Sequence, residues 1–231
     1  MSRAAALVLA LIPAPAFAQA YQCTVPARIE PVRSISPDGP TRRAAVGGYT
    51  LAASWSPDYC KTSGDTQSMQ CSGRWGRFGF VLHGLWPEAA RGAYPQWCGQ
   101  PAVPPPAVLR RHLCMTPSPR LLAHEWAKHG TCMAKAPEQY FRVSAILWRS
   151  IRWPDADRLS RREGLTVGDL RREFVTANPA WRTDQIGIDV SRSGWLSQIR
   201  LCYSRRFLPI RCERRRLGAG DATPMKIWRG L

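Results

Sequence analysis

The chain has 231 residues and carries 33 lysines and arginines against 16 aspartates and glutamates, a net charge of +17. Nearly all of the positive excess is arginine, which fits either a solvated surface or an electrostatic footprint for a polyanion such as nucleic acid. No stretch after the N-terminal segment is apolar enough to span a bilayer, which excludes a membrane-spanning protein.

Residues 1–20, MSRAAALVLALIPAPAFAQA, have the layout of a secretory signal peptide. One charge, Arg3, precedes an apolar run that is too short for a membrane span and ends in Ala-Phe-Ala at 16–18. We therefore expect residues 1–20 to direct export to a periplasm or out of the cell. Residues 21–231 are expected to form a single soluble domain.

Eight cysteines follow the predicted signal. An even count after an export signal favours four disulfides formed in an oxidising compartment. A structural zinc site requires closer pairs such as CxxC, and no two cysteines of this sequence lie that close. The sequence therefore predicts disulfides and no bound metal.

The first half of the chain predicts strands separated by loops. Residues 21–47 have little periodicity and are expected to form an extended lead-in. Aromatic and β-branched residues predict strands at 49–57 and 76–86. The consecutive prolines of PAVPPPAV predict a loop over 101–108, because they supply no hydrogen bonds for a helix or a sheet.

The second half predicts helices followed by strands. A helix is expected from Ser118 through Lys128, with Ser118 as its cap and Gly130 near its end. Further helices are predicted over 137–151 and 166–178, and alternation over 195–212 predicts a strand pair joined by its own cysteines. Strands, helices and strands in this order predict an α+β fold with an antiparallel sheet.

The stretch HEWAKHGTC at 124–132 concentrates polar side chains. A zinc-protease motif reads HExxH, with both histidines on one helix face. Here the spacing is HExxxH, which places His124 and His129 roughly 140° apart around the helix axis, too far apart for one ion. The stretch therefore does not predict a metal site.

On the same helix, Lys128 lies about 40° from His124 and Glu125 lies about 40° from His129. The four side chains cover one arc and can face a single cleft. A carboxylate, imidazoles and a fixed positive charge suit proton transfer at an anionic substrate. Taken alone, the same pattern also fits a solvated, charged helix face.

The stretch FVLHGLWPE at 80–88 supplies another histidine. An apolar strand leads to His83 and turns at Gly84, and both His83 and Trp86 could be structural. Together with the cluster at 124–132, however, His83 provides a second imidazole with an ordinary pKa of about 6.5. One imidazole can act as base and another as acid, as phosphodiester transfer from an internal hydroxyl requires.

HGLWP at 83–87 followed by HEWAKHGTC at 124–132 resembles the two active-site segments of the ribonuclease T2 family, which are secreted endoribonucleases. The resemblance covers residues 49–132. Beyond Tyr140 only the order of helices, strands and cysteines is similar. The resemblance implies a ribonuclease T2-like α+β fold and cleavage of single-stranded RNA to 2′,3′-cyclic phosphate ends without a cofactor or metal.

The resemblance also implies roles for individual residues. His83 matches the acid that protonates the leaving 5′-oxygen, and His129 matches the base that takes the proton of the ribose 2′-hydroxyl. Glu125 and Lys128 match the pair that stabilises the pentacovalent phosphate. His124 matches a phosphate-binding histidine.

Base recognition carries over less completely. Trp86 matches an aromatic residue against which a base packs. Many members carry a glutamine where Ser54 stands, and some carry an aspartate where Glu88 stands, so a base preference does not transfer. We expect low base specificity through aromatic stacking, with Tyr94 and Trp97 as candidate stacking residues that could equally be core.

Four disulfides are expected, for three different reasons. The resemblance implies Cys98–Cys132. Proximity in the sequence pairs Cys60 with Cys71 and Cys202 with Cys212, and elimination leaves Cys23–Cys114.

The alternative from another functional class is a catalytically inactive, cationic RNA-binding or antimicrobial secreted protein on the same scaffold. It would share the arginines and the disulfides. The five catalytic positions all hold working residue types, which favours the enzyme over this alternative and over a zinc hydrolase. We expect a monomer that binds single-stranded RNA and no membrane.

Overall fold

The computed structural model describes residues 20–21, 23–63 and 65–230 of the chain. The signal peptide predicted over residues 1–20 lies outside the described residues except for Ala20. Within the described ranges, none of the helices combines the length and the apolar character that crossing a bilayer requires.

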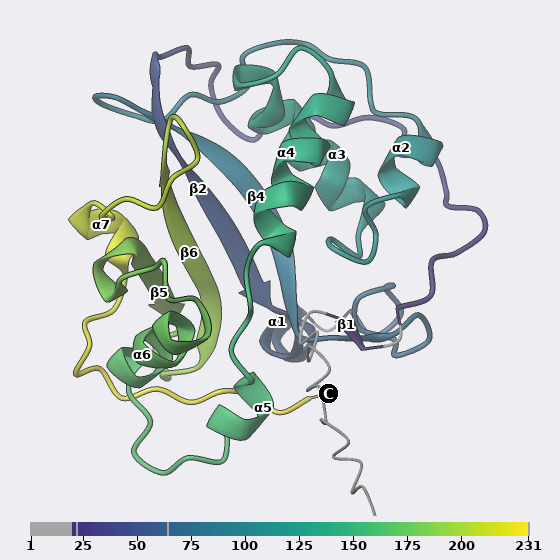
Figure 1. Ribbon diagram of the computed structural model, residues 1–231. Coiled ribbons are helices and arrows are strands. Elements are labelled where there is room, and N and C mark those ends of the chain that lie inside the picture. The colour runs from purple at the N-terminus through teal and green to yellow at the C-terminus, as the bar shows by residue number, and fades with distance from the viewer. Residues whose placement is uncertain (1–19, 22, 64, 231) are drawn as a thin grey trace, which may run out of the picture.

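A four-stranded antiparallel sheet forms the centre of the protein (Figure 1). In spatial order its strands are β4 (Phe80–Ala89), β2 (Val46–Trp55), β6 (Leu196–Ser204) and β5 (Ile186–Val190). A second, small sheet pairs the two-residue strands β1 (Ala20–Tyr21) and β3 (Arg77–Phe78). The predicted α+β class with an antiparallel sheet is confirmed.

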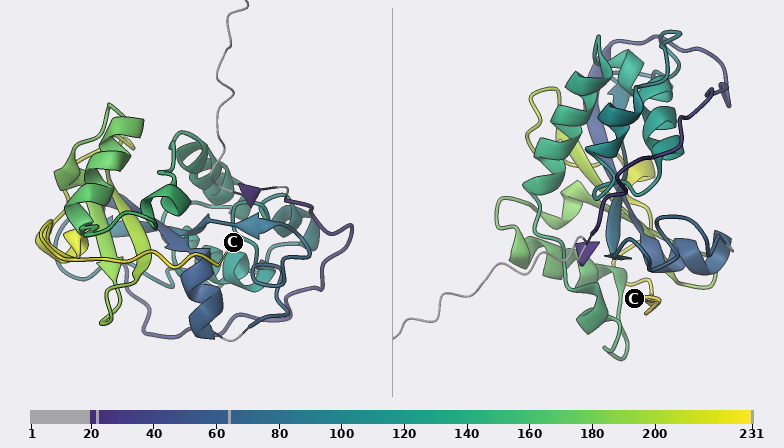
Figure 2. Two further views of the ribbon diagram at one scale, coloured as in Figure 1. Left: turned by 90° about the horizontal axis from the view of Figure 1, so that it is seen from below. Right: turned by 90° about the vertical axis from the view of Figure 1, so that its right-hand side faces the viewer.

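Helices cover one face of the sheet and one of its edges. The long helices α4 (Pro137–Arg149) and α6 (Val167–Ala177) lie across one face, and α3 (Pro119–Lys128) lies beyond the edge strand β4 (Figures 1 and 2). The shorter helices are α1 (Ser56–Ser63), α2 (Pro106–Arg110), α5 (Ala156–Leu159), α7 (Arg214–Leu217) and the 3₁₀-helices η1 (Gly130–Cys132) and η2 (Thr183–Gln185).

The core lies between the sheet and helices α4 and α6. Leu51 of β2 and Ile199 of β6 are fully buried there, as are Phe141 of α4 and Phe174 of α6. Full burial of each such side chain contributes about 2 kcal/mol to folding. Since side chains alternate along a strand, the polar residues of β2, β4 and β6 face the opposite side of the sheet.

Strand β4 contains a β-bulge at His83. Leu82 and Gly84 pair with consecutive residues of β2, so His83 is the extra residue. A bulge shifts the alternation of a strand by one residue. Leu82 before the bulge and Leu85 after it both belong to the core, and His83 and Trp86 both lie on the other face.

The predicted helix starts are confirmed by their caps. The Ser118 side chain accepts a hydrogen bond from Leu121 N at the start of α3. At the start of α6, which begins where the sequence predicts a helix, Thr166 and Asp169 form a capping box. Hydrogen bonds from the Thr166 backbone and hydroxyl lower the pKa of Asp169 to about 2.

Two predictions of local structure are wrong in part. The loop predicted over 101–108 ends early, because Pro106 takes the first position of α2, where a proline needs no hydrogen-bond donor. Only the first half of the strand pair predicted over 195–212 is a full strand, β6; after a turn in which Phe207 adopts a φ of 58°, the chain returns antiparallel to the end of β6 in a single bridge between Tyr203 and Pro209. The longer partner of β6 is β5, which the sequence did not predict.

All four expected disulfides are present. They are Cys23–Cys114, Cys60–Cys71, Cys98–Cys132 and Cys202–Cys212. The first ties the extended lead-in to the segment before α3, and the third ties the loop after β4 to η1. Four disulfides are typical of proteins that fold in an oxidising compartment.

The disulfides should differ in what they contribute to stability. Cys23–Cys114 closes a sequence separation of 91 residues and Cys60–Cys71 one of 11. Loop-closure entropy predicts losses of about 5 and about 3 kcal/mol when each pair is replaced by alanine. Urea unfolding of the two double variants measures the difference, and equal losses would show that loop entropy does not set their contribution.

Candidate active site

A cavity of about 440 Å³ opens on the face of the sheet that the long helices leave uncovered. It is lined by the six residues whose roles the family resemblance implies, namely His83, Trp86, His124, Glu125, Lys128 and His129. Strand β4 and helix α3, which are far apart in the sequence, therefore contribute to one site.

Helix α3 presents its polar side chains on one arc, as its spacing predicts. Lys128 is the last residue of the helix, and His129 caps it by donating its backbone N–H to Glu125 O at 3.0 Å. The chain then turns into η1 at Gly130, where a Cβ atom would come within 2.3 Å of the Trp126 ring. The close packing at Gly130 sets the direction in which the chain leaves the site.

Glu125 is the most deeply buried charged group of the cavity. Its Oε2 atom accepts a hydrogen bond from Trp86 Nε1 at 2.7 Å, and its Oε1 atom lies 3.7 Å from His83 Nε2. Burial raises the pKa of Glu125, and the charge of His83, the bond from Trp86 and the charge of Lys128 oppose that rise. The helical spacing placed Glu125 near His129, but in the structure the Glu125 carboxylate faces His83 instead.

His83 is held on both sides of its ring. Its Nδ1 atom lies 2.9 Å from Gln198 Oε1 and 3.5 Å from Ser54 Oγ, while Nε2 faces Glu125 and the cavity. Its ring also meets Trp86 edge-on, with centroids 5.2 Å apart. The bulge in β4 makes this placement possible, because it turns His83 to the same face as Trp86.

His129 is a buried, neutral imidazole. Its side chain is packed between the rings of Trp86 and Tyr94, at 5.7 and 6.1 Å. Burial and, to a lesser extent, the positive charges of Lys128, His124 and His83 together lower its pKa to about 3. His129 is therefore uncharged near neutral pH, which is the protonation state that a general base requires.

His124 and Lys128 share an acidic partner that the sequence did not predict. Asp38 lies in the extended lead-in, and its Oδ2 atom is 2.8 Å from Lys128 Nζ and 3.7 Å from His124 Nε2. Its other oxygen accepts from Trp97 Nε1 at 3.2 Å. The hydrogen bond from Lys128 lowers the pKa of Asp38, while burial lowers that of His124 despite the nearby carboxylate.

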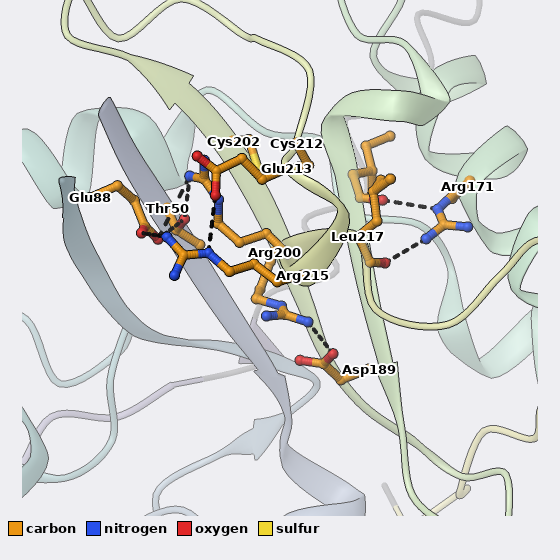
Figure 3. The surroundings of a disulfide bond; sticks show 12 residues. Thr50, Glu88, Arg171, Asp189, Arg200, Cys202, Cys212, Glu213, Arg215 and Leu217 are labelled. Atoms are coloured by element: carbon orange, nitrogen blue, oxygen red, sulfur yellow. Dashed lines mark hydrogen bonds and ion pairs between the residues drawn. A yellow bond between two sulfur atoms is a disulfide. The ribbon is translucent and has the colours of Figure 1, made fainter. Parts of the chain in front are cut away.

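A network of arginines and carboxylates borders the cavity near α7 (Figure 3). Glu88 accepts a hydrogen bond from Thr50 Oγ1 at 2.6 Å and lies 3.7 Å from Arg216 and 3.9 Å from Arg215. Glu213 pairs with both arginines as well. Glu88 is therefore anchored in the wall of the cavity by partners of its own chain.

The two candidate stacking residues differ in position. Tyr94 lines the cavity and carries the Arg42 guanidinium over its ring at 4.9 Å. Trp97 is 4% exposed and packs edge-on against His124, so it is a core residue that supports the site from behind.

The sequence missed Asp38, Gln198 and Arg200 as residues of the site. Asp38 lies in a segment without periodicity, so no signal could have found it. Gln198 and Arg200 occupy alternate positions of a predicted strand, and that alternation did predict a polar face. What it could not predict is which other strand that face meets.

Taken together, the cavity can transfer protons at an anionic group. A neutral, buried imidazole lies opposite an imidazole that reaches the cavity through Nε2. A lysine and a further histidine lie beside them and hold a carboxylate, Asp38, in the way that they could hold another anion.

Gly84 should be essential to this arrangement. A Cβ atom at that position would lie 2.0 Å from Glu125 Oε2 and 2.6 Å from Trp86 Nε1. We expect Gly84→Ala to break the bond between these side chains and to cost about 2 kcal/mol of stability. Thermal unfolding measures the loss.

The matched control is Gly99→Ala, whose Cβ would meet Thr131 at an ordinary 3.7 Å. Equal stability of the two alanine variants would show that β4 has room to shift away from α3.

Comparison with known proteins assigns the chain to a family. Residues 46–156 match the model of the Ribonuclease T2 family. The chain is 30% identical over 188 residues to a probable ribonuclease of Haemophilus influenzae, covering 76% of this chain and 64% of that protein. It is 38% identical over 99 residues to a ribonuclease of Aeromonas hydrophila, covering 43% of each. The chain thus spans less than two thirds of the length of either relative.

Solved structures show the same fold. Trichomaglin, described as an S-like ribonuclease, superposes with a TM-score of 0.61 at 20% identity over 79% of this chain and 97% of that chain. RNase NT, solved in complex with 5′-AMP, does so with a TM-score of 0.61 at 21% identity over 79% and 98%. The segment 46–156 contains both histidine-bearing stretches of the cavity. The chain belongs to the ribonuclease T2 family.

Proposed function

We propose that this protein is an endoribonuclease that cleaves single-stranded RNA by transphosphorylation to 2′,3′-cyclic phosphate ends. The observation that carries the proposal is the convergence of His83, His129, Lys128 and Glu125 on one cavity. The ribonuclease names of the relatives in two bacteria support it. The net charge of +17 supports a polyanionic substrate.

In the first step, His129 takes the proton of the ribose 2′-hydroxyl. The 2′-oxygen attacks the adjacent phosphorus, the bond from phosphorus to the 5′-oxygen breaks, and His83 protonates that leaving oxygen through Nε2. The neutral state of His129 and the orientation of His83 Nε2 towards the cavity fit these roles. Hydrolysis of the cyclic phosphate follows with the two histidines exchanging roles.

Negative charge develops on the non-bridging phosphate oxygens during this step. Lys128 is a fixed cation at the cavity, and His124 lies beside it on the next turn of α3. Glu125 is adjacent to His83 and, with its raised pKa, can hydrogen-bond to the phosphate when protonated. Preplaced groups of this kind stabilise the transition state most, because they need no reorganisation.

The internal 2′-hydroxyl serves as the nucleophile, so the mechanism uses no metal or other cofactor. DNA lacks this hydroxyl and should be inert. RNase NT was solved with 5′-AMP, and we propose that Trp86 and Tyr94 stack against bases here with low base specificity. We also propose a monomer with a single catalytic domain over residues 21–231, exported to a periplasm or secreted.

The reaction class is tested by incubating the oxidised protein with an RNA oligonucleotide in excess EDTA, with a 2′-deoxy oligonucleotide as control. Cyclic-phosphate fragments from RNA alone, identified by mass, are the expected result. Intact RNA that binds tightly would instead indicate a cationic binding protein. Cleavage that EDTA abolishes would indicate a metal-dependent hydrolase.

The two catalytic histidines can be tested against a third. We expect His83→Ala and His129→Ala to lower kcat by at least about a thousandfold while RNA affinity changes little, because arginines supply most of the binding. His112→Gln is the control, since His112 is part-buried and stacks on Phe141 away from the cavity. Parallel losses of binding and cleavage in both alanine variants would mean that the histidines are structural.

Lys128→Ala should change the pH dependence as well as the rate. Lys128 helps to lower the pKa of His129 to about 3, so its removal should raise that pKa towards the ordinary value. Activity requires neutral His129 and is lost as the pH falls through its pKa. The acid limb of the kcat/KM profile should therefore move to higher pH, with kcat falling more than affinity. An unmoved limb and an unchanged kcat would remove Lys128 from the mechanism.

A further inference from the structure

Behind His83 lies a chain of hydrogen bonds to which the proposed mechanism assigns no role. It runs from His83 to Gln198 on β6, from Gln198 to Asp189 on β5, and from Asp189 to Arg200 on β6. Residues of β4, β6 and β5 thus contribute to the surroundings of one imidazole, with β2 lying between β4 and β6. Figure 3 shows the last link, the Arg200 guanidinium turned onto the Asp189 carboxylate.

The order of donors along this chain is fixed by the charged end. The Asp189 carboxylate can only accept, so the group that Gln198 directs at it, 3.4 Å from Asp189 Oδ2, must be the amide NH₂. Arg200 donates to the other oxygen of Asp189 and holds the carboxylate in place. The oxygen of the Gln198 amide is consequently left to face His83 at 2.9 Å.

Because Gln198 Oε1 is an acceptor, the nitrogen that faces it must carry a proton. We propose that Gln198 is a positioning residue that holds the His83 proton on Nδ1, so that Nε2 is the atom that exchanges protons in the cavity. This inference rests on the proposed function for its catalytic consequence. Its structural content, the tautomer of His83, does not depend on it.

The consequence for the reaction is that His83 never has to change its tautomer. When the imidazolium has given its Nε2 proton to the leaving 5′-oxygen, the neutral ring keeps the Nδ1 proton that Gln198 accepts. The Nε2 lone pair then faces the cavity, ready to take a proton from water in the hydrolysis step. In serine proteases a carboxylate orients the catalytic histidine directly and fixes its tautomer. Here the Asp189 carboxylate would do so indirectly, through the amide of Gln198.

Two other neighbours of the ring do not explain the same orientation. Ser54 lies at 3.5 Å from Nδ1, and its hydroxyl can either donate or accept, so it fixes no tautomer. Glu125 lies 3.7 Å from Nε2, too far for a hydrogen bond. Ser54 and Gln198 are directly opposite each other in the pairing of β2 with β6, which brings both side chains under the ring.

The tautomer can be measured without activity, by nitrogen-15 NMR of histidine-labelled full-length protein. Neutral His83 of the wild type should be protonated at Nδ1, and Gln198→Leu should shift it towards the Nε2-protonated form. A wild-type ring protonated at Nε2 would overturn the proposal. Since this measurement uses no RNA, its outcome is separate from whether the protein cleaves RNA at all.

The kinetic arm uses the same variant. If the wild type cleaves RNA, Gln198→Leu should lower kcat about tenfold, the value of one hydrogen bond, with KM within about twofold. A loss of kcat with an unchanged tautomer would overturn the proposal, because Gln198 would then act by another route. Full activity with a changed tautomer would overturn its catalytic part.

A second variant covers the case in which Gln198→Leu does not fold. Asp189→Asn can donate as well as accept, so it allows the Gln198 amide to turn over, and we expect the same shift in tautomer and kcat to a smaller extent. The matched control is Asp157→Asn, which changes an exposed aspartate of α5 that is likewise paired with an arginine, Arg161. Equal changes in both asparagine variants would show that the effect is not specific to the chain behind His83.

Discussion

The buried carboxylate of Glu125 connects helix α3 to the central sheet, and the other residues of the site are arranged around it. Trp86 binds it from β4, His83 faces it, and Gly84 leaves the space that it occupies. Burial raises the pKa of the Tyr140 hydroxyl, and the nearby negative charge of Glu125 raises it further. A buried ionisable group without partners would destabilise the fold, so the groups that position Glu125 for chemistry are also those that make its burial tolerable.

Charge is arranged differently near the cavity and away from it. Cationic side chains at the cavity are already paired within the chain: Lys128 with Asp38, Arg200 with Asp189, and Arg216 with Glu88. The excess positive charge therefore lies mostly on the outer surface, where it attracts a polyanion at long range. Close to the reacting groups, geometry rather than net charge selects what is bound.

The sequence predicted those parts of the structure that depend on local pattern. The Ser118 cap, the arc of polar groups on α3 and the disulfide framework are local or combinatorial signals, and the structure confirmed them. Contacts across strands have no such signal. The partner of His83, Gln198, is 115 residues away along the chain, and Asp38 lies in a segment whose course depends on tertiary contacts and the Cys23–Cys114 disulfide. Strand β5 was missed because its neighbours decide whether so short an apolar run becomes a strand.

The bulge at His83 has a consequence for the kinds of change that β4 can accept. Since the bulge reverses the alternation within one strand, pairing of the same residues with β2 without the bulge would turn Trp86 and Glu88 into the core and bring Leu85 out to the cavity. Substitutions along β4 affect one side chain each, whereas loss of the bulge from the full-length strand would exchange the inside and outside of its whole second half. The bulge is thus as strict a requirement of this strand as the identity of its residues.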